Sequence, residues 1–348
     1  MTDLAPEVLS DNRVPVYYAG GEQINAFRHL DPPVQGPEDW IGSLVPLPRA
    51  ILGPEADPTT GVSRLGDGRS LADVVAADPV GWLGSDLATA FDGSSGLLVK
   101  LLDAGERLPV HCHPTRAFAQ RNLGSIFGKT EGWLVMRAQP DAAVWLGMGS
   151  QVDVSDLRAW IDRQDVDSML AAMVRVPVRP GDVLYVPAGV PHSIGPGVMI
   201  TELQEPTSFS VLAEYEVFGV DADAATLGLG WDLALSCFDL SDFSNGMDRL
   251  RPEARVLVHS TEGVVTSLFG SEADGFFRAY RIDCKGRIQL PEPCFGVLVI
   301  VDGAGEMAWP GGHLPVRGGY TLVVPFGAGP ITFTGDLAAF ACLPPVVS

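Results

Sequence analysis

The sequence has 348 residues, of which 46% are hydrophobic and 19% are charged. This composition excludes a largely disordered chain, because it offers enough apolar surface to form a core, and the length suggests two domains. The 43 acidic and 23 basic residues give a formal net charge of -20, which argues against nucleic acid and anionic membranes as partners.

The sequence indicates neither membrane insertion nor secretion. Its apolar runs, such as residues 337–343 and 297–301, are much shorter than the ~20 residues of a spanning helix. Residues 1–12 contain three acidic side chains and no apolar stretch, unlike a secretory signal. The five cysteines are scattered without a CxxC pair, which is typical of reduced thiols. We therefore expect a cytoplasmic protein.

Short β-strands are the main elements that the sequence predicts. Forty glycines and 28 prolines divide the chain into short segments, and the apolar runs between them, such as residues 144–146, 183–186 and 321–324, are rich in residues that favour strands. The apolar spacing predicts one helical segment over about 155–173, with Ser155 as N-cap and a break near 165–167, and a second over about 224–237.

A polar stretch divides the chain into two unequal parts. Residues 239–253 contain serine, asparagine, glycine and proline but few apolar residues, as is typical of a connection. Another series of strands and turns begins near Arg255. We therefore expect a mainly β protein with one domain over residues 1–252, which includes the helical segments, and a second over residues 253–348.

Two histidine patterns lie in the first part of the chain. Residues 105–113 have the form G-x5-H-x-H, and because side chains two apart on a strand face the same side, His111 and His113 can reach one ion. Residues 181–192 have the form G-x5-P-x-G-x2-H and end in His192. These patterns hold three of the six histidines; those outside them are His29, His259 and His313. The spacing predicts a metal site.

The two patterns resemble the two halves of the cupin signature, and further matches narrow the resemblance. His113-Pro114, then Gly-Lys-Thr-Glu-Gly-Trp at 128–133, then Pro-Ala-Gly-Val-Pro-His at 187–192 are similar to the hallmark of type I mannose-6-phosphate isomerases. Additional similar stretches are residues 38–43, 100–104 and 200–204. The resemblance implies two cupin (double-stranded β-helix, or jelly-roll) domains: a metal-binding catalytic domain over 1–252 and a degenerate C-terminal one over 253–348, without metal, as in the short bacterial forms.

The resemblance also implies a reaction and a cofactor. The reaction is the metal-dependent interconversion of an aldose phosphate and a ketose phosphate, mannose 6-phosphate and fructose 6-phosphate, through a cis-enediol. The implied ligands are His111, His113, Glu131 and His192. Imidazoles and one carboxylate suit Zn2+, and they also suit Fe2+, Mn2+ or Ni2+. No partner other than the small sugar phosphate is implied.

Further site residues follow from the same matches. Glu202 is the candidate for proton transfer, with the alternative that it orients a ligand histidine. Lys129 is a candidate to hold an oxyanion or the phosphate. Lys100, Arg116 and Ser43 are candidates for substrate binding, and Lys100 and Lys129 are two of only three lysines in the chain.

The chain departs from the family at positions that serve the phosphate or the metal. Pro109 replaces a serine, His111 replaces an amide ligand, and Ser210 stands where the family has an arginine. Loss of a charge-assisted phosphate contact costs roughly 1.5–3 kcal/mol, which Arg116 or Arg121 would have to offset. Two alternatives therefore stay open: an isomerase of an unphosphorylated or other sugar, and a non-catalytic sugar-binding or redox cupin.

Overall fold

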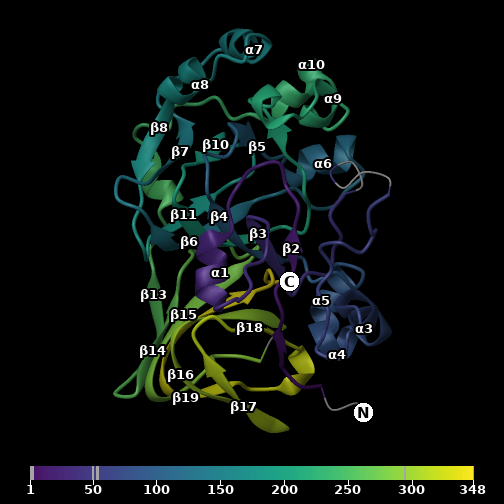
Figure 1. Cartoon of the computed structure of the whole chain (residues 1–348), viewed down its shortest axis with the longest axis vertical. Helices are drawn as coiled ribbons and strands as arrows, with labels where there is room; N and C mark the ends of the chain where they lie inside the picture. The colour runs from purple at the N-terminus through teal and green to yellow at the C-terminus, as the bar shows by residue number, and fades with distance from the viewer. Residues whose placement is uncertain (1–3, 49–50, 52–54, 294, 348) are drawn as a thin grey trace.

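The computed structural model describes residues 4–48, 51, 55–293 and 295–347. Within these ranges the named strands form three antiparallel sheets, two of them in the upper half of Figure 1 and one in the lower half. The mainly β fold predicted from the sequence is confirmed.

A six-stranded sheet lies at the centre of the molecule. Its order is β2 (Arg13–Val14), β3 (Glu38–Ile41), β4 (Leu98–Ala104), β11 (Val198–Gln204), β6 (Glu131–Ala138) and β9 (Val183–Val186). Every residue of β4 and β11 is buried. The reason is that Leu101 and Leu203 pack in a cluster with residues of the lower sheet, whereas Leu102 and Ile200 pack toward the second upper sheet.

The second upper sheet has five strands and faces the first across a shared apolar cluster. Its order is β12 (Val211–Leu212), β5 (His111–Cys112), β10 (His192–Ile194), β7 (Ala143–Met148) and β8 (Met173–Pro177). In this sheet His192 pairs directly with His111. The antiparallel register therefore places the two histidine patterns of the sequence side by side.

The lower sheet consists of eight strands. Its order is β1 (Glu7–Leu9), β18 (Thr321–Val324), β16 (Gly296–Trp309), β19 (Thr332–Leu343), β15 (Arg278–Gln289), β14 (Gly263–Ser267) and β13 (Arg255–Ser260), with β17 (Gly312–Arg317) on β16. The first strand of the chain thus belongs to this sheet, because β1 pairs antiparallel with β18. Residues 7–9 therefore belong to the same sheet as the strands after residue 252, although they lie in the first of the two parts expected from the sequence.

Helices cover the upper end and one side of the sheets (Figure 1). They are α1 (Glu22–Arg28), α3 (Leu71–Ala77), α4 (Pro79–Leu83), α5 (Ser85–Ala90), α6 (Arg116–Asn122), α7 (Val154–Asp162), α8 (Val166–Ala172), α9 (Ala222–Ala225) and α10 (Trp231–Ala234). The described residues also form four short 3-10 turns: η1 (Glu216–Phe218), η2 (Leu235–Cys237), η3 (Met247–Leu250) and η4 (Phe326–Ala328). No described helix is long and apolar enough to cross a membrane.

The two segments expected to be helical are interrupted in the structure. In the first, Gln164 has a positive φ of 47°, and Asp165 caps a new helix by accepting the Ser168 N–H. Helix α7 itself begins one residue before Ser155, which is not its N-cap. In the second, Gly228 and Gly230 both have positive φ, which separates α9 from α10 because a helix needs negative φ.

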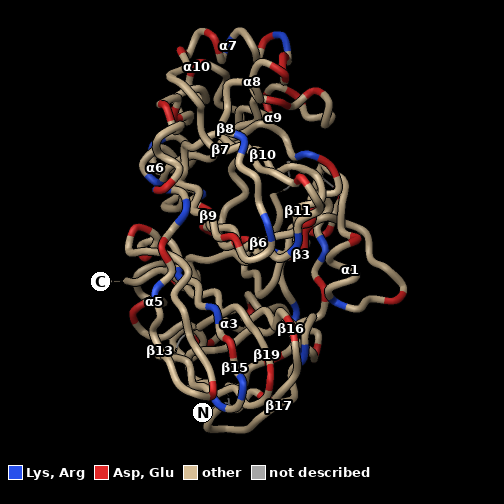
Figure 2. The backbone as a smooth tube through the Cα atoms, turned by 90° about the vertical axis from the view of Figure 1, so that its left-hand side faces the viewer, with Lys and Arg blue, Asp and Glu red and all other residues tan. Residues whose placement is uncertain are grey.

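Charge is spread over the whole molecule. Figure 2 shows acidic residues on both the upper and the lower half, and the described lysines and arginines do not gather into one continuous stripe.

Candidate active site

Three buried histidines converge between the two upper sheets. His111 and His192 are the first residues of β5 and β10, and His113 follows β5 directly. One ring nitrogen of each lies within 4.8 Å of those of the other two. The turn before β10 joins the two histidine segments, because the Gly189 N–H donates to the His113 carbonyl at 2.8 Å. Gly189 has a φ of 95°, a conformation that favours glycine.

Backbone carbonyls set the orientation of all three imidazoles. The Nδ1 atoms of His111, His113 and His192 lie 2.8, 2.7 and 2.9 Å from the carbonyl oxygens of Pro109, Phe209 and Val190. A carbonyl can only accept, so each Nδ1 carries the proton of the neutral ring and each Nε2 keeps its lone pair. The trio therefore presents three nitrogen ligands of the kind that a divalent metal ion binds.

Burial keeps these rings neutral. It lowers the pKa of His111 well below the ordinary value, and the neighbouring His192 and His113 lower it further. Burial and the charge of Lys129 lower the pKa of His113 to about 3, and burial also lowers the pKa of His192. Neutral imidazole is the form that ligates a metal.

Glu131, the first residue of β6, adds a carboxylate beside the histidines. Its Oε1 lies 2.9 Å from His113 Nε2, and its Oε2 lies 3.6 Å from His192 Nε2. Burial raises the pKa of Glu131, but Lys129, whose Nζ is 3.0 Å away, together with His113 and His192 outweighs it and holds the pKa well below the ordinary value. Glu131 Oε1 and His113 Nε2 are thus 2.9 Å apart although both are acceptors without a hydrogen. A cation bound to both atoms would remove this repulsion. The residues present fit a divalent metal ion.

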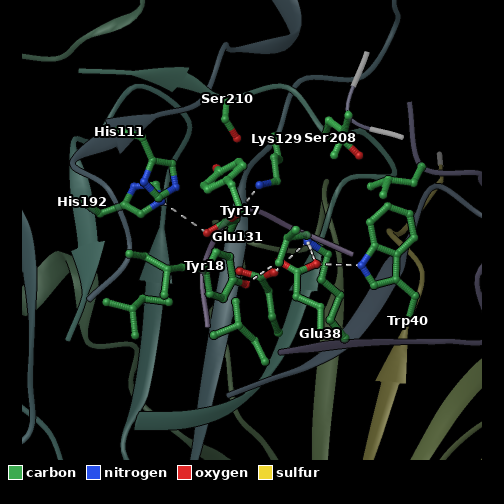
Figure 3. Close-up of a pocket in the computed structure, with 18 residues that line it drawn as sticks. Tyr17, Tyr18, Glu38, Trp40, His111, Lys129, Glu131, His192, Ser208 and Ser210 are labelled. Atoms are coloured by element: carbon green, nitrogen blue, oxygen red, sulfur yellow. Dashed lines mark hydrogen bonds and ion pairs between the residues drawn. The ribbon is translucent and has the colours of Figure 1, made fainter. Parts of the chain in front are cut away.

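His111, His192, Glu131 and Lys129 line one pocket of about 580 Å3, which includes its open mouth. Figure 3 shows His111 and His192 on one side of it, Trp40 on the other, and Lys129 and Glu131 between them. A pocket of this size suits a small molecule such as a sugar. Three of the four candidate metal ligands and the other polar groups of the pocket therefore face the same small volume.

A row of paired residues crosses the six-stranded sheet beneath this pocket. Trp40 pairs with Lys100, Lys100 with Glu202 and Glu202 with Trp133 in adjacent strands. Residues paired in this way point to the same face of a sheet. The ladder from β3 to β6 thus delivers side chains from four separate parts of the sequence to one place.

Lys100 is shared by two carboxylates. Its Nζ lies 3.2 Å from Glu38 Oε2 and 3.3 Å from Glu202 Oε2. Burial lowers the pKa of Lys100, but these two carboxylates raise it above the ordinary value, so the ammonium stays charged. Glu38 also accepts hydrogen bonds from Tyr18 Oη and Trp40 Nε1.

Glu38 and Tyr18 are pocket residues that the sequence analysis did not select. Glu38 lies in the stretch 38–43, which was noted only for its similarity to the family. Nothing in the local sequence shows that its carboxylate meets Lys100, because that contact depends on the pairing of β3 with β4.

Glu202 combines burial with a pKa near neutrality. Its Oε1 accepts from Trp133 Nε1 at 3.2 Å, and its Oε2 accepts no hydrogen bond from the described residues although Lys100 is near. Burial and the charge of Glu131 raise the pKa of Glu202 to about 7, against the opposing effect of Lys100. A buried carboxyl with this pKa can take up and release a proton near neutral pH.

Two expected substrate-binding residues are not among the described residues that line the pocket. Arg116, at the start of α6, donates to Glu205 and to the Gly275 carbonyl. The Ser43 hydroxyl donates to the Val45 carbonyl in a buried turn. Ser210 does line the pocket, together with Ser208, and the Ser210 hydroxyl lies 3.4 Å from His113 Nδ1.

Comparison with known proteins gives consistent results. No family model matches the chain. A mannose-6-phosphate isomerase of Streptococcus mutans is 29% identical over 246 residues, 70% of this chain and 73% of that protein. The isomerase ManA of Bacillus subtilis is 26% identical over 69% of this chain and 72% of its own length.

A solved structure shares the fold over nearly the whole chain. The mannose 6-phosphate isomerase crystal structure from Bacillus subtilis has a TM-score of 0.74 and 19% identity, over 97% of this chain and 99% of that one. The fold expected from the sequence is therefore confirmed. In its fold, its sequence and its histidine cluster, the chain is thus similar to the mannose-6-phosphate isomerases.

Proposed function

We propose that the chain is a metal-dependent aldose–ketose isomerase that interconverts mannose 6-phosphate and fructose 6-phosphate through a cis-enediol. One observation carries the proposal: the three histidines cluster at a pocket that His111 and His192 line together with Glu202, a buried carboxyl whose pKa is raised to about 7. A metal site and a proton-transfer group in one pocket are what an enediol mechanism requires. The similarity to named mannose-6-phosphate isomerases supports the choice of substrate.

The proposed metal ligands are His111, His113, Glu131 and His192, and the proposed ion is Zn2+. Neutral imidazoles with one carboxylate suit zinc, and the isomerisation needs no change of metal oxidation state. When bound, such an ion supplies Lewis acidity, which makes the C2 proton of the aldose more acidic and stabilises negative charge on the sugar oxygens.

Glu202 is the proposed base and acid. As a carboxylate it takes the proton from C2 of the aldose, and as a carboxylic acid it returns that proton to C1, while the O2 proton moves to O1. A pKa of about 7 makes both directions accessible near neutral pH. The alternative, that Glu202 orients a ligand histidine, has no support in the contacts, because all three Nδ1 atoms meet backbone carbonyls.

The two pocket lysines are the proposed cationic groups for the substrate. Lys129 Nζ lies 3.0 Å from Glu131 and 3.1 Å from His113 Nε2, which suits it to stabilise an oxyanion close to the ion. Lys100 holds Glu202 at its Oε2 and is positioned to contact a sugar hydroxyl. Ser208 and Ser210 line the pocket on the side of Lys129 (Figure 3) and are proposed donors to the phosphate in place of the family arginine.

Two further proposals concern organisation and setting. We propose that residues 1–252 form the metal-binding cupin domain and that residues 253–348 form a degenerate second cupin domain to which β1 adds a strand. We also propose that the reaction takes place in the cytoplasm, in keeping with four buried free cysteines among the described residues.

A coupled assay of sugar turnover tests the proposal. The purified protein is given mannose 6-phosphate or free mannose, and the ketose formed is measured. We expect turnover of the phosphorylated sugar at least about 100-fold faster, given roughly 1.5–3 kcal/mol for each charged phosphate contact. Equal or faster turnover of free mannose would contradict the choice of substrate, and oxygen consumption without isomerisation would contradict the reaction.

A further inference from the structure

A buried carboxylate outside the pocket holds the loop that carries Lys129. Glu205 follows β11 and is fully buried. Its Oε1 accepts the Gly128 N–H at 3.2 Å, and its Oε2 accepts the Thr130 N–H at 2.9 Å. One carboxylate thus binds the backbone amide on each side of Lys129.

The same loop is held by additional contacts. The Thr207 hydroxyl donates to the Gly128 carbonyl at 2.7 Å, and the Lys129 N–H donates to the Pro114 carbonyl at 3.1 Å. There is no room for a side chain at Gly128, where a Cβ would lie 2.5 Å from the Pro114 oxygen. The backbone position of Lys129, and with it the reach of its ammonium, is therefore closely determined.

Arg116 extends this arrangement to the C-terminal part of the chain. Its Nε donates to Glu205 Oε1 at 2.5 Å and a terminal nitrogen donates to the Gly275 carbonyl at 2.8 Å. The guanidinium carbon lies 4.6 Å from the centre of the Phe276 ring. Gly275 and Phe276 belong to the segment between β14 and β15, so Arg116 connects that segment to Glu205.

The same segment supports the strand that begins at Glu131. Gly132 follows Glu131, which faces the pocket, and because neighbouring residues of a strand face opposite sides, Gly132 faces away from it. A Cβ there would come within 2.5 Å of the Phe269 ring and 2.7 Å of the Phe277 ring. Residues 269–277 therefore contact β6 directly, and they are connected to the loop through Arg116 and Glu205.

We propose that Glu205 and Arg116 are positioning residues for Lys129. Through these two residues, the segment 269–277 of the C-terminal part fixes the position of the loop that carries Lys129. Removal of the Glu205 charge leaves a buried amide N–H without its acceptor, and removal of Arg116 leaves a buried carboxylate without its cation. Either change frees the loop to open. The effect on turnover rests on the proposed function, whereas the effect on the loop does not.

Chemical labelling of lysine tests the position of Lys129 directly. The chain has three lysines, Lys100, Lys129 and Lys285, so a small amine-reactive reagent followed by peptide mass spectrometry gives one rate for each. The variants are Glu205→Gln and Arg116→Met, with Arg116→Lys as the conservative change. The matched control is Arg158→Met, which breaks an exposed ion pair with Asp162 on α7.

We expect Lys129 to be labelled about tenfold faster in Glu205→Gln and Arg116→Met, because local opening of the loop exposes its amine. Arg116→Lys should give a smaller increase, since it restores the charge beside Glu205 but cannot bind both partners. The Lys285 rate should not change in any variant, and the control should match the unmodified chain at all three lysines.

Turnover supplies the second readout. We expect kcat on mannose 6-phosphate to fall about tenfold in Arg116→Met with KM changed less than twofold, because the substrate contacts remain while the ammonium is misplaced. An unchanged Lys129 labelling rate in Arg116→Met overturns the proposal, and this variant is informative even if Glu205→Gln does not fold, since Arg116 is only partly buried. If Lys129 is labelled faster in these variants but the unmodified chain turns over no sugar, the positioning role of Glu205 and Arg116 is supported and the proposed function is contradicted.

Discussion

The Lys100 ammonium lies 3.3 Å from Glu202 Oε2, directly across the β4–β11 ladder. This contact opposes the effect of burial, which together with Glu131 raises the pKa of Glu202 to about 7. Because Glu38 binds the same ammonium at 3.2 Å, the two carboxylates compete for one cation. The pKa of the proposed base therefore depends on a lysine whose strand lies between the strands of Glu38 and Glu202.

Removal of this lysine should change the pH dependence of turnover. Glu202 must be ionised to take the C2 proton, so kcat/KM for mannose 6-phosphate should rise with pH through about 7 and then level off. Lys100→Met removes an effect that lowers this pKa, so the rising limb should move to higher pH by about one unit or more. The pH profiles of this variant and of Lys285→Met, an exposed lysine on β15, are compared. A limb that stays in place in Lys100→Met contradicts the assignment.

Replacement of the proposed base should separate chemistry from metal binding. Glu202→Gln keeps the shape of the side chain but cannot take up a proton, so kcat should fall by about 100-fold to 10,000-fold. Metal content, measured by elemental analysis, should equal that of the unmodified chain. A large loss of bound metal in this variant would support the other role, in which Glu202 orients a ligand.

Loss of one ligand should weaken metal binding. His113→Ala removes an Nε2 lone pair that the His113–Phe209 hydrogen bond holds in place, and we expect the affinity for Zn2+ to fall by at least about 100-fold. The control is His313→Ala, an exposed histidine near Glu306 on the β16–β17 hairpin. Competition with a chromophoric chelator gives both affinities, and equal values would rule out His113 as a ligand.

The packing between β6 and residues 269–277 can be tested by stability. Gly132→Ala places a methyl group 2.5 Å from the Phe269 ring, and overpacking of this kind costs about 1–3 kcal/mol. Gly66→Ala is the control, because its Cβ would meet only Glu7 at 3.7 Å. Urea unfolding should show a lower free energy of unfolding for Gly132→Ala alone. Equal stability of the two variants would mean that the segment is not tightly packed there.

The sequence predicts the metal site better than the rest of the pocket. His111, His113 and His192 lie in short local patterns, and strand geometry alone brings two of them to one face. Glu38 and Glu205 were not found, because their contacts depend on strand pairing and on a helix far away in the sequence. Arg116 was expected at the substrate, but Glu205 draws its side chain toward Gly275 instead.

In the fold too, the elements that depend on local sequence were predicted and those that depend on distant contacts were not. Short apolar runs between glycines and prolines predict strands, and the mainly β architecture follows from them. The helices α3, α4 and α5 were not predicted, because each has only five to seven residues and such short helices depend on tertiary packing. The place of β1 beside β18 joins residues more than 300 positions apart, which no local pattern specifies.

The most direct test of the central claim is turnover of mannose 6-phosphate as a function of bound metal. The protein is first stripped with a chelator and then titrated with Zn2+, while product formation and metal content are measured together. The account predicts no turnover in the stripped protein and a linear rise that ends at about one ion per chain, the number that a single cluster of ligands holds. Full turnover by the stripped protein, or none after one ion has bound, would contradict it.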